Sequence, residues 1–203
     1  MTQIALPLDH AGPQGPASIV IGDANMRVAE ALAATQDWPF GCAILAGPPR
    51  SGKSLFARWF GSHTGGGAID DADSKDETEI FHAWNRARED GYPLLLTVGA
   101  EGWDIELPDL RSRMGAALQL EIGAPDDDMA AELMLSHAAQ RGLALGEGAP
   151  AYLIPRMERS HAAIERIVAE IDRLSLERMA PATMSIWRDA LEAVQGPEQA
   201  RLL

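Results

Sequence analysis

Residues 47–54 constrain the fold more than any other stretch, because they read GPPRSGKS and match the Walker A spacing G-x-x-x-x-G-K-S. Glycines at this spacing let backbone N–H groups converge on phosphate oxygens, while the lysine reaches the terminal phosphates and the serine hydroxyl binds Mg²⁺. An apolar stretch at 42–45 precedes the motif, and residues 55–60 have helical composition. That order places a helix N-terminus at the phosphates. We therefore predict a phosphate-binding loop here; an ordinary Gly/Pro turn is the alternative.

The region around this loop predicts an α/β domain. Residues 80–89 carry apolar side chains at helical spacing, and 94–98 is a continuous apolar run typical of a strand buried on both faces of a parallel sheet. Asp70 and Asp71 follow two apolar residues. We expect Asp70 to hold Mg²⁺ and Asp71 to orient an attacking water; a solvated acidic turn is the alternative.

The residues after 124 predict a second, all-helical part. A proline and three aspartates at 125–128 are suited to the start of a helix. We expect helices at 129–140, 151–157, 160–179 and 185–194. Ser160 is the predicted N-cap of the third, whose isoleucine and leucine stripe indicates core. His137 and His161 have no second ligand at metal spacing, so neither is expected to bind a metal.

The composition limits the class of protein. The chain has 203 residues and a formal net charge of −13, which argues against autonomous DNA binding because that depends on clustered Lys and Arg. The single cysteine, Cys42, lies in the apolar stretch before the loop and is predicted to be a core residue in a reducing compartment. No apolar run reaches membrane-spanning length and no signal pattern begins the chain, so we expect a cytoplasmic protein with no membrane association.

Residues 1–18 are expected to be a flexible tail. Residues 3–8 form a short apolar peptide, QIALPL, and residues 11–18 are rich in Gly and Pro. A linear peptide that anchors a protein to a partner needs a side chain that forms hydrogen bonds and apolar side chains that fill pockets. Gln3 can serve the first purpose, and Leu6 and Leu8 the second. A terminal arm lying on the protein's own surface is an equal alternative.

With these elements in order, the chain resembles an AAA+ nucleotide-binding module and, more narrowly, the Hda family, relatives of the bacterial replication initiator DnaA. The resemblance covers nearly the whole chain. Residues 3–8 resemble the Q-x-x-L-P-L peptide with which Hda proteins bind the DNA polymerase sliding clamp, residues 21–25 the adenine-side motif, and residues 107–113 the box that ends in an arginine finger. The resemblance implies an AAA+ P-loop domain at 19–123 and a small helical lid at 124–203.

The resemblance also implies a function and a set of site residues. Clamp-bound Hda carrying ADP contacts ATP-bound DnaA and stimulates its hydrolysis, so that initiation does not recur. Arg113 would be the arginine finger acting in trans. From the residues alone, a solvated basic turn at Arg111 and Arg113 is an equal alternative. Self-association is a further expectation, because AAA+ modules commonly place nucleotide at subunit contacts. The residues expected to contact ADP or ATP are Val20, Ile21, Asn25, Gly47, Pro48, Pro49, Arg50, Ser51, Gly52, Lys53, Ser54 and Leu55. Mg²⁺ would lie at Ser54 and Asp70, and the clamp at Gln3, Ile4, Leu6, Pro7 and Leu8.

Three departures from the family pattern bear on catalysis. Too few residues separate Lys53 from Asp70 for the usual extra strand and helix, so the sheet is expected to be one strand short. Val98-Gly99-Ala100 stands where the family has a polar sensor, and the lid arginine aligns with Ala162, flanked by Arg159 and Arg166. These losses predict weak or no intrinsic ATP hydrolysis, so whether the protein is itself an enzyme is left open at this point. An active AAA+ ATPase, such as a helicase loader or clamp-loader-like motor, is the alternative, and a nucleotide-stabilised scaffold is a third.

Overall fold

The computed structural model of the chain describes residues 19–196, which separate into two compact units. One unit is Ala24–Gly123, and the other contains the remaining described residues, 19–23 and 124–196. The predicted domain limits at 1–18, 19–123 and 124–203 stay a prediction. None of the described helices is long and apolar enough to cross a membrane.

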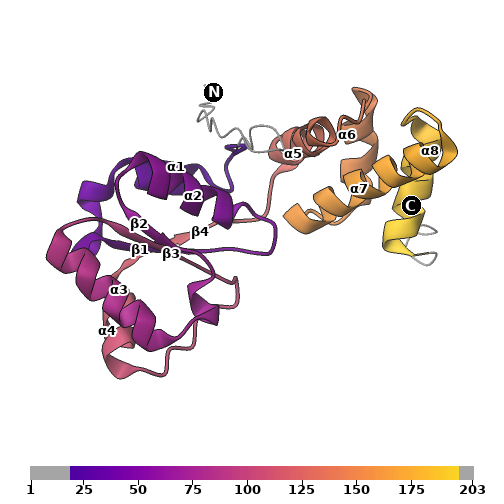
Figure 1. Cartoon of the computed structure of the whole chain (residues 1–203). Helices are drawn as coiled ribbons and strands as arrows, with labels where there is room; N and C mark the ends of the chain where they lie inside the picture. The colour runs from indigo at the N-terminus through magenta and orange to yellow at the C-terminus, as the bar shows by residue number, and fades with distance from the viewer. Residues whose placement is uncertain (1–18, 197–203) are drawn as a thin grey trace. The chain divides into compact units, whose positions relative to one another are not determined.

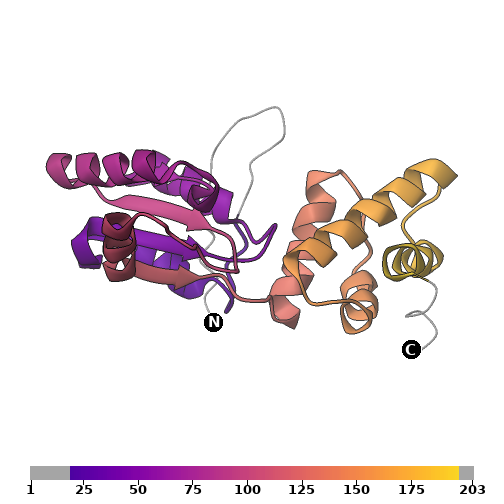
Figure 2. The same cartoon turned by 90° about the horizontal axis from the view of Figure 1, so that it is seen from below.

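The unit Ala24–Gly123 is built on a four-stranded parallel sheet (Figures 1 and 2). Its strands are arranged in the order β2-β3-β1-β4 and are β1 Cys42–Ala46, β2 Gly67–Ile69, β3 Leu94–Val98 and β4 Leu118–Glu121. All five residues of β3 are buried, because the strand lies inside the sheet and is covered on both faces. The predicted α/β fold with a parallel sheet is confirmed.

Helices cover both faces of this sheet (Figure 1). The first pair is α1 Met26–Ala33 and α2 Lys53–His63, and the second pair is α3 Glu77–Asp90 and α4 Pro108–Ala116. Side chains alternate along a strand, so one face of β1 and β3 packs with α3 and α4 in a single core that includes Cys42, Leu96, Ile80, Leu110 and Met114.

Local sequence explains where several helices begin and end. The Asp76 carboxylate accepts hydrogen bonds from the backbone N–H groups of Thr78 and Glu79 and caps α3, which ends at Gly91 with φ 74°. Asn25 is the N-cap residue of α1, although its side chain makes no capping hydrogen bond to the helix.

The second unit is helical, as the sequence predicts. Its helices are α5 Asp127–Gln140, α6 Gly148–Leu153, α7 His161–Arg178 and α8 Met184–Gln195. Ser160 caps α7 through a hydrogen bond from the Ala163 N–H at 3.2 Å, and the α7 stripe that begins with Ile164 and Ile167 is buried in a shared core. The predicted helix 151–157 instead ends as a 3-10 turn at Ile154–Arg156, where Pro155 has no N–H to donate.

Candidate functional site

The phosphate loop leaves the carboxyl end of β1 and enters α2. Two of its residues adopt left-handed backbone conformations, Arg50 with φ 65° and Gly52 with φ 92°. Gly47 is closely packed, because a Cβ there would lie 3.0 Å from Ser51 Oγ and 3.2 Å from Ile122 Cβ, so these neighbours would have to shift. The glycines of the motif are therefore required by a backbone turn and by close packing.

The loop presents hydrogen-bond donors at the N-terminus of α2. The first helical i to i−4 bond runs from the Phe56 N–H to the Gly52 carbonyl at 3.0 Å, so the N–H groups of the first turn precede that ladder. Ser51 is buried, and its Oγ has no hydrogen-bond partner within the described chain. A buried hydroxyl without a partner, next to N–H groups at the positive end of a helix dipole, fits a bound anion.

Lys53 closes the loop on itself. Its Nζ donates hydrogen bonds to the carbonyl oxygens of Gly47 at 2.7 Å and Pro48 at 3.1 Å. These bonds hold the ammonium group beside the loop backbone. A phosphate group in the loop would offer charged acceptors to the same ammonium, which bind it more strongly than neutral carbonyls do.

Asp70 follows β2 and is held by a residue of the neighbouring strand. The Thr97 hydroxyl of β3 donates a hydrogen bond to Asp70 Oδ1 at 2.6 Å and accepts one from the Asp71 N–H at 2.9 Å. Thr97 is fully buried. Thr97 was not predicted as a site residue, because it lies within an apolar run. A lone hydroxyl at the end of a buried strand is the signal that would have found it.

The sheet register places Asp70 at the same edge as the loop. Ile69 pairs with Leu96, and Thr97 pairs with Leu45 of β1, so Asp70 lies two strands from β1. Neighbouring strands are about 4.8 Å apart, which puts the Asp70 backbone roughly 10 Å across from β1. That distance suits a carboxylate acting on Mg²⁺ through water. Within residues 19–196 no group of three or more His, Cys, Asp or Glu gathers as a ready metal site, and the metal role stays a prediction.

Asp71 is exposed and has φ 51°, so it forms the turn between β2 and the 3-10 segment Ala72–Ser74. Its backbone N–H is used by Thr97. The predicted role in orienting water stays a prediction.

Arg113 lies away from the loop, in the second half of α4. The strands all end at the edge that carries the loop, and α4 returns the chain toward the opposite edge, where β4 begins at Leu118. Its guanidinium lies over the rings of Phe81, at 4.1 Å from the centroid, and Trp84, at 4.4 Å. Nη1 also donates to Asn85 Oδ1 at 2.7 Å.

The three partners of Arg113 were not predicted as functional. The apolar side chains at helical spacing in residues 80–89, which predicted a helix, are Ile80, Phe81, Trp84 and Ala87. Ile80 and Ala87 are buried, but Phe81, Trp84 and Asn85 are half-buried at the margin of the core. Two aromatic residues three apart on a helix form one surface strip, which is the signal that was available.

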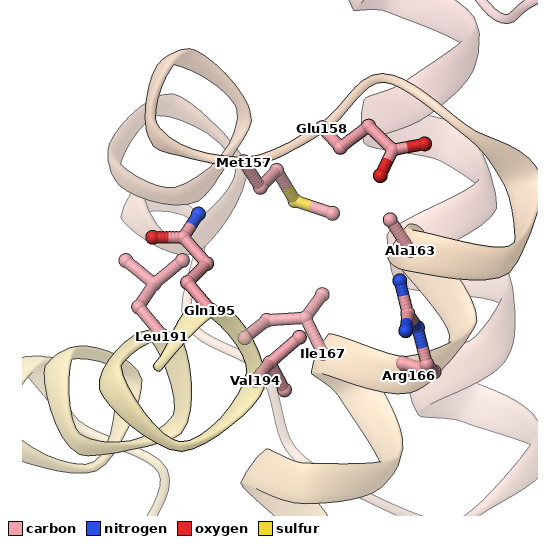
Figure 3. A pocket seen from close by; sticks show the side chains of 8 residues that line it. All are labelled: Met157, Glu158, Ala163, Arg166, Ile167, Leu191, Val194 and Gln195. Carbon is pink, nitrogen blue, oxygen red and sulfur yellow. The ribbon is translucent and has the colours of Figure 1, made fainter. Parts of the chain in front are cut away.

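Other arginines are held by their own surroundings. Arg111 donates two hydrogen bonds to the Ile105 carbonyl, and Arg159 forms an ion pair with Asp127 at 3.1 Å. Arg166 lines a hollow of about 120 Å³ in the helical unit, with Glu158 on the same rim and Ile167 below (Figure 3). No predicted site residue lines that hollow.

Residues 20–25 precede the sheet. Val20 and Ile21 belong to the helical unit, where Gly22 packs against Met129 of α5. Asn25 is 2% exposed at the start of α1. Leu55 lies in the first turn of α2. The adenine-contact role of these residues stays a prediction.

Cys42 is 1% exposed in β1, which confirms it as a core residue. Burial raises the pKa of its thiol to about 12. The neutral thiol therefore packs as a small apolar group and is not a nucleophile.

The predicted clamp-binding peptide, Gln3, Ile4, Leu6, Pro7 and Leu8, lies outside the described residues.

No family model matches the chain. The fold is similar to domain III of the Thermotoga maritima replication initiation protein DnaA, with a TM-score of 0.72 at 12% identity over 87% of this chain and 95% of that one. It is also similar to the Thermotoga maritima RuvB Holliday junction branch migration motor, with a TM-score of 0.64 at 18% identity over 89% and 72%. AMPPCP-bound DnaA from Aquifex aeolicus gives a TM-score of 0.58 at 14% identity over 77% and 63%. The fold is thus similar to that of DnaA domain III and of the RuvB motor.

Proposed function

We propose that this protein is a regulator of chromosomal replication initiation of the Hda type. It holds an adenine nucleotide, ADP, in its phosphate loop, binds the sliding clamp through residues 3–8, and stimulates ATP hydrolysis on DnaA. The DnaA-like AAA+ fold and the intact phosphate loop support this proposal.

The observation that carries the proposal is the position of Arg113. The phosphate loop lies where β1 ends, and Arg113 lies where α4 approaches the start of β4. An arginine on the far side of its own sheet serves a nucleotide on another molecule better than the one in its own loop. In that role its guanidinium donates hydrogen bonds to the γ-phosphate oxygens on DnaA and stabilises transition-state charge.

The loop residues bind this protein's own nucleotide. The α2 N-terminus and the Ser51 hydroxyl receive phosphate oxygens, and Lys53 exchanges its carbonyl acceptors for phosphate. Ser54 and Asp70 are the residues for Mg²⁺, which neutralises phosphate charge when bound. The AMPPCP-bound DnaA structure, similar in fold, supports adenine nucleotide as the ligand class.

The direct experiment measures ATP turnover by DnaA with loaded sliding clamp, comparing wild type with Arg113→Ala. We expect the variant to lose stimulation. Arg86→Ala is a matched control, because it removes the same charge from an exposed position on α3. Equal stimulation by wild type and Arg113→Ala would reject the finger.

The proposed clamp-binding peptide, residues 3–8, is tested separately by measuring how much protein is retained on immobilised sliding clamp. Gln3→Ala combined with Leu6→Ala should abolish retention, whereas Gln14→Ala, in the same tail but outside the motif, should bind like wild type. Retention of the double variant at the wild-type level would remove the clamp from the proposal.

An active motor is the competing function, favoured by the similarity in fold to the RuvB branch migration motor. It predicts steady-state ATP turnover by this protein alone, lost on Lys53→Ala or Asp70→Ala. We expect no such turnover above background, and ADP to be recovered from the purified, denatured protein. If neither turnover nor stimulation occurs, a nucleotide-bound scaffold remains.

A further inference from the structure

Three side chains from α3 surround the guanidinium of Arg113 on α4. Phe81 and Trp84 offer their ring faces at centroid distances of 4.1 and 4.4 Å, and the Asn85 amide oxygen accepts a hydrogen bond from Nη1 at 2.7 Å. We call Phe81, Trp84 and Asn85 the aromatic shelf. Both distances are well inside the range of about 6 Å over which a cation is attracted to a ring face.

The shelf restrains the guanidinium and leaves most of its donors for a ligand. A guanidinium has five N–H donors. Within residues 19–196 the hydrogen bond to Asn85 is the one that Arg113 makes. Ring faces take up the flat side of the group, so the donors along its edge are not consumed by stacking. Arg113 is half-buried, which leaves part of the side chain at the surface.

An arginine on a flexible stem loses rotamer freedom when it binds a phosphate, and this loss weakens the contact. A guanidinium already fixed by stacking and by one hydrogen bond has lost that freedom in the free protein. Preorganised donors also need no rearrangement as charge develops in the transition state.

We propose that Phe81, Trp84 and Asn85 are positioning residues that hold Arg113 in the orientation in which it reaches a protein-bound triphosphate in trans. This inference rests on the proposed function of Arg113 as an arginine finger. The ligand class is the γ-phosphate of a nucleotide bound to another AAA+ module.

The surroundings of Trp84 indicate that this residue holds Arg113 through its ring face and not through its indole N–H. Its indole Nε1 is buried and has no hydrogen-bond partner in the described chain. An unpaired buried N–H is costly, and phenylalanine at this position would remove it while keeping a ring face. Trp84→Phe should therefore keep the function of the shelf, and Trp84→Leu should not.

The first test observes the free protein by NMR and needs no partner. In the wild type, we expect the order parameter of the Arg113 Nε–Hε bond to be close to about 0.85, the value of rigid backbone. In the double variant Phe81→Leu, Trp84→Leu, we expect it to fall below about 0.6, the range of flexible groups. If Arg113 is flexible in the wild type, the proposal that the aromatic shelf positions it is wrong, whether or not Arg113 acts on DnaA.

The second test measures clamp-dependent stimulation of DnaA as a function of the concentration of this protein. We expect Trp84→Leu and Asn85→Ala to lower the maximal stimulated rate about 10- to 100-fold, the size of effect that misplacing a group by about 1 Å produces. The concentration for half-maximal stimulation should change little, and Trp84→Phe should restore the rate. A changed half-maximal concentration at an unchanged maximal rate would make the shelf a docking surface instead.

Trp59→Leu is the matched control, because Trp59 is a half-buried tryptophan on α2 stacked on His63 at 5.4 Å and does not contact Arg113. It should lose no maximal rate. The two proposals fail differently. If Arg113→Ala stimulates normally, the finger itself is wrong; if Arg113→Ala is inactive but the shelf variants have full maximal rates, only the shelf is wrong.

Discussion

The phosphate loop and the aromatic shelf lie in the same unit and support charge recognition in different ways. The loop uses one continuous segment, in which backbone N–H groups and Lys53 converge at the start of α2. The shelf uses side chains from α3 to hold an arginine on α4, at positions 28 residues apart in the case of Asn85 and Arg113. Under the proposed function, the loop binds this protein's nucleotide and the shelf serves a nucleotide on DnaA. We therefore expect a substitution in one region to leave the task of the other region intact.

The largest effect should come from Arg113→Ala. An arginine finger contributes about 10³- to 10⁵-fold to hydrolysis, so stimulation of DnaA should fall by that order. The affinity of the variant for ADP, measured by calorimetry, should equal that of wild type, because Arg113 is far from the loop. If Arg113→Ala also lowers the affinity for ADP, the loop and the shelf do not act independently.

Lys53→Ala is the reverse experiment. Loss of a hydrogen bond to a charged group costs about 1.5–3 kcal/mol, so the Kd for ADP should rise about 10- to 150-fold. The order parameter of Arg113 should not change. Lys75→Ala, an exposed lysine after the Ala72–Ser74 turn, is the control and should bind ADP normally.

Thr97→Val tests the link between Asp70 and the neighbouring strand. The nearly isosteric change leaves the Asp70 carboxylate and the Asp71 N–H without their partner, so the free energy of unfolding should fall by about 1–3 kcal/mol. Thr97→Ser retains the hydroxyl and should lose less. The Mg²⁺ dependence of ADP affinity should weaken in Thr97→Val. If neither stability nor Mg²⁺ dependence changes, Thr97 does not position Asp70.

Ionisation of Cys42 should affect the core beneath the shelf. Phe81 and Trp84 pack against the same core as Cys42. Burial raises the pKa of Cys42 from its ordinary 9.0 to about 12, so the folded state keeps a proton that the unfolded state releases between those values. The neutral thiol therefore makes its full contribution to the free energy of unfolding below pH 9, and this contribution declines as the pH rises toward 12.

The measurement is the difference in unfolding free energy between wild type and Cys42→Ala as a function of pH. It should be constant below pH 9 and then change by at most about 1.4 kcal/mol per pH unit. Subtracting the variant removes the titration of lysine and tyrosine. A flat difference up to pH 12 would show that the thiol is not protected by burial.

Much of the fold was predictable because it depends on local patterns. The run Leu94–Val98 is apolar throughout, which predicted the buried strand β3. The short spacing between Lys53 and Asp70 predicted that the usual extra strand and helix between them would be missing. In the structure, α2 and β2 are the elements between Lys53 and Asp70, and the sheet of the unit Ala24–Gly123 has four strands. The N-cap Ser160 of α7 was also predicted from the sequence, because a capping side chain acts within its own turn.

The sequence by itself determined the turn at residues 47–54 that leads into α2, because the glycines, the lysine and the start of the helix all lie within one short segment. Only the tertiary structure decided that Thr97 holds Asp70 and that Phe81, Trp84 and Asn85 hold Arg113. These contacts join residues some 27 to 32 positions apart, and sheet order and helix packing bring them together. A pattern along the chain records what each segment prefers, but it does not record which face of one segment meets another.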